Sequence, residues 1–350
     1  MFRIILGFSM LALVMGSGRA VQAQDPQFSQ FYAAPLYLNP ALAGGANQAR
    51  IGMNYRNQWP SIDANFRTMS VYFDYFIEDA KSGVGAILTR DVEGLAGLRS
   101  LSLGLQYSYE LQINKYLGFR PGVQLSIFNR DMNFEKLTFA DQFDQFGRLE
   151  DATSAEFSSL NTGQSKTFFD ISFGGVFFTK RAWLGVSAWH LTQPNQSLIG
   201  EESKLPLKLS VHGGFKFYMK PGVVGSGVYA RNAERSIAPA FQYRKQGEWD
   251  QMDLGMYFTF EPLVLGTWYR GVPFKKLGDA VNNESIVLLL GFVKLGAKDA
   301  LNIGYSFDYT ISKLGPQSGG AHEFSLVYTW PMRNPRKPPA DKLVIPCPDF

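Results

Sequence analysis

Residues 299–314 read DALNIGYSFDYTISKL, and large apolar side chains alternate with small or polar ones along the whole stretch. The odd positions from Leu301 to Ile311 form an apolar face, and the even positions from Asn302 to Ser312 form a polar face. A period of two is the pattern of a β-strand with two unlike faces. Because strands of soluble proteins average about 5–6 residues, a stretch of this length favours a strand that crosses a membrane.

The same alternation continues outward from this stretch, for example at 100–112 and 205–218. An even number of long strands, each with one apolar face, predicts an all-β transmembrane antiparallel β-barrel with a polar lumen. A soluble sandwich is the alternative, but aromatic residues near strand ends, such as Tyr328 and Trp330, are typical of a membrane interface. We predict about fourteen strands, at 48–59, 66–78, 82–91, 98–112, 116–131, 167–179, 182–192, 204–219, 235–246, 249–260, 262–271, 284–296, 299–313 and 321–332.

The connections between these strands give a second test, because outer-membrane barrels alternate short periplasmic turns with longer outer loops. Most predicted connections follow this alternation if the first strand begins and the last strand ends on the periplasmic side. Two do not, since 220–234 is long for a turn and 247–248 is short for a loop. A register error near 220–235, or two more short strands there, is the expected explanation.

The composition excludes several classes of protein and of site. One Cys and three His in 350 residues cannot form an internal disulfide and make a Cys/His zinc site implausible. A net charge of +4 gives no basis for nucleic-acid binding. His212 and His322 have serines nearby, but at spacings of no recognised hydrolase motif, so we expect no enzyme activity and no cofactor. Lumen-facing charges of both signs fit a closed interior better than an ion-selective pore.

The first 23 residues have the features of a secretory signal peptide. Arg3 provides a short basic start, an apolar run follows from Ile4 to Met15, and small or polar residues lead to Ala23. We expect cleavage after Ala23 and export to the bacterial outer membrane.

Residues 24–47 combine three prolines with aromatic and aliphatic side chains, which argues against both a transmembrane strand and a loose tail. Two interpretations remain open: a plug inside the barrel mouth, or an ordered periplasmic lead-in. For the plug, the candidate side chains are Phe28, Phe31, Tyr32, Leu36 and Leu38.

Two further segments lie outside the predicted barrel, which spans 48–332. The connection 132–166 is acidic and rich in Phe, and it could cover the lumen or bind a partner through Phe139, Phe143 and Phe146. The segment 333–350 is Pro-rich, and we expect it to extend into the periplasm. Its candidate contacts are Arg333, Arg336, Lys337 and Phe350, while Cys347 is either an inert thiol or an intermolecular link.

Three stretches resemble motifs of the PorP/SprF family. They are QDPQFSQFYAAPLYLNPALAG at 24–44, GTWYRG at 266–271, and YTISKLG with GGAHEFSL at 309–315 and 319–326. Thr267 and Ala321 stand where Leu and Ser are commoner. The resemblance spans nearly the whole chain after Ala23.

This resemblance implies a FadL-like barrel of the type IX secretion system, in some cases linked to gliding motility. It implies secretion-machinery subunits and a secreted, adhesin-like surface protein as partners, outer-membrane lipid as surroundings, and no catalytic residues. The alternative function is a FadL-like transporter of hydrophobic small molecules, which rests on fold analogy alone.

Overall fold

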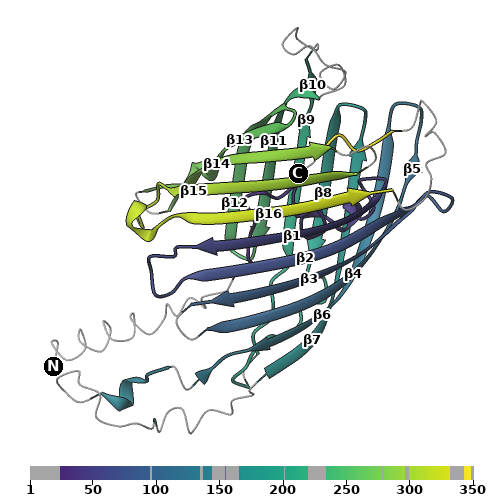
Figure 1. Ribbon diagram of the computed structural model, residues 1–350. Coiled ribbons are helices and arrows are strands. Elements are labelled where there is room, and N and C mark those ends of the chain that lie inside the picture. Colours follow the sequence, from purple (N-terminus) through teal and green to yellow (C-terminus); the bar gives the residue numbers. More distant parts are fainter. Residues whose placement is uncertain are drawn as a thin grey trace, which may run out of the picture.

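The computed structural model describes residues 24–94, 97–134, 137–143, 154, 165–200, 202–219, 234–277, 280–295, 299–331 and 343–347. The predicted signal peptide, residues 1–23, lies outside this described part. Within it, one antiparallel sheet closes into a barrel (Figure 1). Closure is complete because the first strand pairs with the last, from Ala49 opposite Trp330 to Gln58 opposite Ala321.

Fourteen strands make up the barrel in the described part of the chain, which confirms the predicted number. The two-residue strands β5 and β10 continue β4 and β9 beyond a one-residue break and are counted with them. The bounds are β1 Ala49–Gln58, β2 Phe66–Ile77, β3 Ser82–Glu93, β4 Leu98–Tyr109, β5 Leu111–Gln112, β6 Gly118–Asp131, β7 Ser165–Phe178, β8 Ala182–Trp189, β9 Lys208–Phe215, β10 Phe217–Tyr218, β11 Arg235–Gln246, β12 Trp249–Phe260, β13 Leu263–Leu277, β14 Ala280–Leu295, β15 Ala300–Thr310 and β16 Ala321–Trp330. Short helices lie at Pro35–Leu38 (α2), Pro40–Leu42 (η1), Ala140–Gln142 (η3) and Pro316–Ser318 (η5).

The predicted bounds differ most from the structure at β13 and β14, whose hairpin is longer than expected. Two register shifts in this pair, after Arg270 and after Val272, interrupt the period of two that the sequence analysis depends on. β11 and β12 have the predicted bounds, so the described strands contain no register error there. The connection between these two strands is a tight turn, with Gly247 at φ 58°. Residues 220–233, where two more short strands were the other explanation, lie outside the described residues.

The two rims of the barrel differ in the length of their connections. One rim, here the long-loop end, carries 132–164, 190–207 and 311–320. The other, here the short-turn end, carries tight turns such as 179–181 and 261–262. In outer-membrane barrels the longer loops face outward and the short turns face the periplasm.

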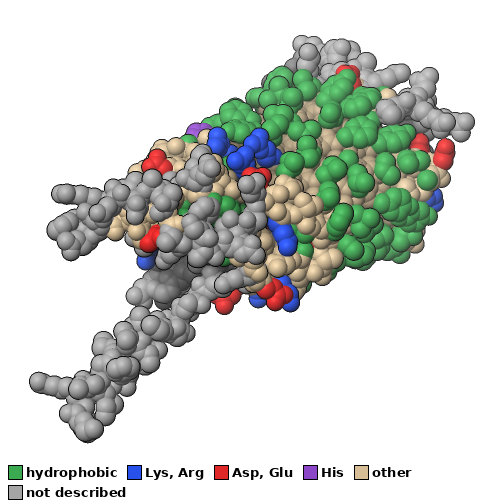
Figure 2. All heavy atoms as spheres, turned by 90° about the horizontal axis from the view of Figure 1, so that it is seen from below, with side chains coloured by type: hydrophobic (Ala, Val, Ile, Leu, Met, Phe, Trp, Pro, Cys, Tyr) green, Lys and Arg blue, Asp and Glu red, His purple; other side chains and the backbone are tan. Residues whose placement is uncertain are grey.

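The outer wall is apolar and the inner wall is polar, as the alternation predicts. On β15, Ile303 and Tyr309 are 48% and 46% exposed, whereas Asp308 between them is 3% exposed and faces inward. Figure 2 shows hydrophobic side chains gathered in a broad band on one face, with most charged side chains at its borders. No helix in the described ranges is long and apolar enough to span a membrane.

Candidate functional site

Residues 24–47 run through the inside of the barrel, from the long-loop end to the short-turn end. Gln27 bonds to Glu284 near the long-loop rim, and the Gly44 amide donates to Asp74 at 2.7 Å near the other rim. Between these points, side chains from several strands bond to the segment's backbone. These contacts are Tyr72 with Ala33, Gln106 with Leu36, Ser187 with Leu38 and Ser108 with Ala43.

The five side chains predicted for a plug are all buried in this interior. Phe28, Phe31, Tyr32, Leu36 and Leu38 are each at most 4% exposed. The Phe31 ring packs edge-on against Trp268 of the GTWYRG motif, with 4.8 Å between the ring centroids. The Tyr32 hydroxyl accepts a 2.7 Å hydrogen bond from the indole N–H of Trp183 on β8.

Strand glycines make room for this segment. A Cβ at Gly122 of β6 would lie 2.4 Å from the Ala41 nitrogen, and one at Gly174 of β7 would lie 2.0 Å from the Asn39 side-chain oxygen. Any other residue at these positions would collide with the segment. The glycines of the inner wall therefore fit an occupied interior.

A buried cluster of charges links Ser29 of the segment to four strands, β1, β13, β15 and β16. Asp308 accepts from Arg56 and from Arg270, each at 2.8 Å, and from the Ser29 hydroxyl at 2.7 Å. The Ser29 amide donates to Glu323 at 2.6 Å. Burying charges is costly unless each has a partner, so this cluster requires Ser29 and its strand partners to be in place together.

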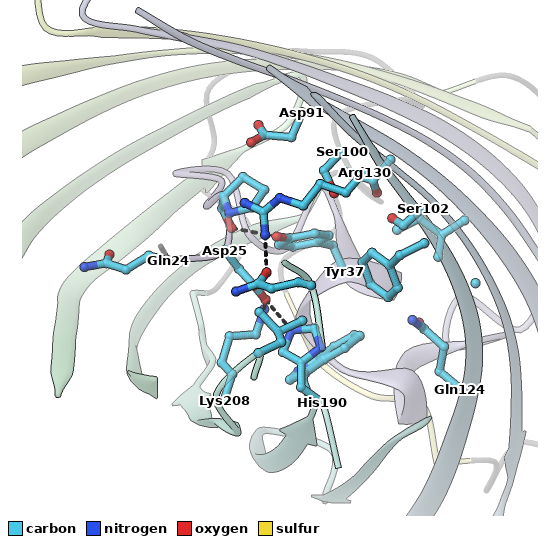
Figure 3. Close-up of a pocket in the computed structure, with 18 of the residues that line it drawn as sticks. Gln24, Asp25, Tyr37, Asp91, Ser100, Ser102, Gln124, Arg130, His190 and Lys208 are labelled. Carbon is cyan, nitrogen blue, oxygen red and sulfur yellow. Dashed lines mark hydrogen bonds and ion pairs between the residues drawn. The ribbon is translucent and has the colours of Figure 1, made fainter. Parts of the chain in front are cut away.

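A second polar contact holds the start of the segment near the long-loop end. Asp25 lies 2.8 Å from His190 and 2.5 Å from Lys208 (Figure 3). The other ring nitrogen of His190 lies 2.9 Å from Asp170. Burial alone would lower the pKa of His190, but the carboxylates of Asp25 and Asp170 outweigh it and raise the pKa to about 9. Burial would raise the pKa of Asp25, but His190 and Lys208 hold it well below its usual range. The contact is therefore an ion pair at neutral pH.

The C-terminal segment differs from the prediction. Leu343 and Ile345 are 3% and 7% exposed and belong to the same interior apolar cluster as Tyr32, and Cys347 packs against it. The expected extension into the periplasm is thus wrong for residues 343–347. A Pro-rich composition does indicate an extended chain, but two aliphatic side chains gain more by burial inside the barrel than by exposure to water. Cys347 is only partly buried at this position.

A cavity of about 620 Å³ opens above the segment at the long-loop end. We call it the vestibule. Its floor includes Asp25, Phe28 and Tyr37, and the outer parts of several strands form its walls. Aromatic, amide and charged side chains are mixed on these walls, among them Arg56, Trp59, Phe66, Asp91, Glu93, Trp189, Gln242, Arg244, Trp249 and Asn282. Such a mixture of apolar surface and a few convergent polar groups is typical of binding pockets.

The other predicted site residues are only partly described. Phe139 is half-buried and Phe143 is 42% exposed, next to the short helix η3. Neither lines the vestibule. Phe146, Arg333, Arg336, Lys337 and Phe350 lie outside the described residues. No group of three or more His, Cys, Asp or Glu among the described residues is placed to hold a metal ion.

The vestibule was not predicted from the sequence. Asp91 and Glu93 lie two positions apart, so they share one face of a strand. The predicted strand ended at 91, which left Glu93 in a loop and hid this shared face. The amide residues of β11 and β14 carry no signal of their own in the sequence.

The family model described as type IX secretion system membrane protein PorP/SprF matches residues 20–328. No curated protein matches the chain in sequence.

Several solved structures are similar in shape. A Pseudomonas aeruginosa FadL homologue has 11% identity and a TM-score of 0.42, covering 84% of this chain and 93% of its own. The TodX deltaS2S3 mutant monoaromatic hydrocarbon channel has 10% identity and a TM-score of 0.46, covering 85% and 94%. The Pseudomonas putida toluene transporter TodX has 10% identity and a TM-score of 0.44, covering 88% and 95%. We draw no conclusion about function from scores this low.

Proposed function

This chain belongs to the PorP/SprF family of type IX secretion system membrane proteins, and from that membership we propose that it acts by binding rather than by catalysis. It is a β-barrel of the outer membrane, with its long-loop end directed outward. We propose that this end holds a secreted surface protein and helps to secrete or anchor it. Subunits of the secretion machinery are the expected partners on the periplasmic side.

The occupied lumen is the observation that carries this proposal. Residues 24–47 bond to strands around the whole barrel, and residues 343–347 fill part of the remaining interior. We propose that the N-terminal segment is a plug, which makes the barrel a rigid platform and not an open channel. A rigid floor under an open vestibule suits a binding site, since a preorganised surface loses little entropy on association.

The alternative is a transporter of hydrophobic small molecules, and the same contacts weigh against it. A hydrophobic substrate would have to displace buried ion pairs such as Arg56–Asp308 to cross the lumen. Breaking a buried pair costs about 3–5 kcal/mol. Passage would then require a large rearrangement of the segment and of its ion pairs.

A mild-detergent pull-down tests the proposal. The affinity tag goes into the exposed β7–β8 turn at Lys180 and Arg181, on the short-turn rim, because the C-terminal segment is buried. We expect mass spectrometry to find one large secreted surface protein together with secretion-machinery subunits.

The control is an unrelated outer-membrane barrel of similar abundance, tagged in the same way. Recovery of the chain alone, from membranes that contain those proteins, would contradict the binding role. Flux of small hydrophobic molecules into liposomes would then be the next measurement.

A further inference from the structure

Two carboxyl groups in the vestibule lack the cation that other buried carboxylates have. Asp91 and Glu93 lie at the end of β3 and line the vestibule. Asp91 is 3% exposed and accepts a 2.5 Å hydrogen bond from Thr68. No Lys, Arg or His of the described residues forms an ion pair with either. Arg130, which faces them from β6, donates to Gln196.

Other carboxylates of the interior are paired, which makes this pair distinct. Asp253 contacts Arg244 and Arg270, at 2.9 and 2.7 Å, and Asp250 contacts Lys275 at 2.5 Å. A carboxylate that is removed from water without a cation is costly. The Asp91–Glu93 pair therefore favours a ligand that brings a positive charge.

Two further side chains, both more than nine-tenths buried, present unpaired polar atoms at the same cavity. Gln242 of β11 is 4% exposed, and its Oε1 has no hydrogen-bond partner among the described residues. Arg56 of β1 is 2% exposed, and its Nε likewise lacks an acceptor there. Both residues line the cavity, but the two unpartnered atoms themselves have almost no accessible surface, so a ligand reaches them only after a side chain turns. A peptide backbone supplies the complement of each.

The vestibule also has apolar surfaces for the stem of a long cationic side chain. Trp59, Phe66, Trp189 and Trp249 line it, and Lys208 of the chain itself already lies over the Trp189 ring at 5.1 Å. Cations are attracted to aromatic faces, and the methylene stems of Arg and Lys pack on them.

We propose that the vestibule binds an extended peptide segment of the secreted partner through an Arg or Lys whose charged group sits against Asp91 and Glu93. This inference rests on the proposed function and specifies what the partner presents. A neutral glycan would satisfy Gln242 and stack on the tryptophans, but it would leave the two carboxyls without a cation.

The test uses the full mature chain in nanodiscs and two blocked heptapeptides. One reads Gly-Thr-Val-Arg-Val-Thr-Gly, and its twin carries citrulline, which has the shape of arginine without the charge, at the centre. Binding is read by calorimetry and by the fluorescence of the vestibule tryptophans. We expect the arginine peptide to bind about tenfold more tightly than its twin. In the double variant Asp91→Asn/Glu93→Gln the two peptides should bind within about twofold of each other.

The control is Asp63→Asn, which removes one carboxylate from an exposed position between β1 and β2 that does not line the vestibule. It should keep the tenfold preference. Equal binding of the twins to the wild-type chain overturns the proposal, as does an unchanged preference in the double variant. Failure of both peptides to bind at about 1 mM, the weak end of specific binding, also overturns it.

The native partner separates this proposal from the proposed function. If the wild-type chain and the double variant retain the same secreted protein equally well in a pull-down, binding is real and the cationic contact is wrong. If the wild-type chain retains no secreted protein, the proposed function itself fails.

Discussion

Replacing Arg270 by Met should destabilise the barrel more than any exposed charge substitution. The Arg270 side chain is 1% exposed and donates to Asp253 at 2.7 Å, to Asp308 at 2.8 Å and to the Ser29 hydroxyl at 2.9 Å. Met keeps about the length of the aliphatic stem and removes the guanidinium group with its charge and its donors. Two buried carboxylates then each lose one cation.

The expected loss of unfolding free energy depends on the ion pairs that remain after Arg270→Met. Removing one partner of a buried ion pair costs about 3–5 kcal/mol. Here Asp253 keeps Arg244 at 2.9 Å and Asp308 keeps Arg56 at 2.8 Å, so neither becomes fully unpaired. We expect the low end, about 3 kcal/mol, which is roughly a hundredfold change in the unfolding equilibrium.

The assay is urea unfolding in lipid vesicles, with heat-modified gel mobility as a second probe. The control, Lys275→Met, breaks a 2.5 Å pair with Asp250, but the Lys275 side chain is 42% exposed. Solvent screening reduces its effect to below about 1 kcal/mol. A double variant with Asp308→Asn should recover part of the loss, because without Arg270 the Asp308 carboxylate has one cation in place of two. Equal effects of Arg270→Met and Lys275→Met would refute the reasoning.

Three other predictions concern the interior segments. Gly122→Val would place a side chain too close to Ala41, so the free energy of unfolding should fall by about 1–3 kcal/mol. An unchanged urea midpoint would mean that residues 24–47 do not lie against β6. The His190–Asp25 pair should stabilise the chain fully below pH ~6.5, where His190 is protonated even in the unfolded chain, and this stabilisation should be lost as pH rises through about 9. Thermal unfolding midpoints measured from pH 6 to 10 check this. The decline should be absent in His190→Gln. Leu343→Asp should expel the C-terminal segment from the barrel and raise the rate of maleimide labelling at Cys347 about tenfold. An unchanged labelling rate would place that segment outside the barrel.

The strands could be predicted because each carries its own local signal. Asp308 between Phe307 and Tyr309 identifies the inner face of β15 without reference to any other strand, and the structure places Asp308 inside. The number of strands followed from the same period. Where bulges interrupt that period, after Arg270, the predicted strand ends too early.

What fills the barrel could not be predicted in the same way. The contact between Gln30 and Glu323 joins residues 293 positions apart, and no local pattern reports it. The aliphatic residues of 343–347 look like part of a loose Pro-rich tail, because composition alone does not show which surface they cover. The vestibule arises from strand ends that meet only after the barrel closes.

The most direct test of the central claim is photo-crosslinking in living cells of the native bacterium. A benzoylphenylalanine replaces Trp249, which lines the vestibule and is 49% exposed, and in a control it replaces Phe169, which is 73% exposed on the outer wall. The account predicts a crosslink from position 249 to one secreted surface protein and none to that protein from position 169. Crosslinks from position 249 that contain no secreted protein, in cells that display their surface proteins normally, would contradict it.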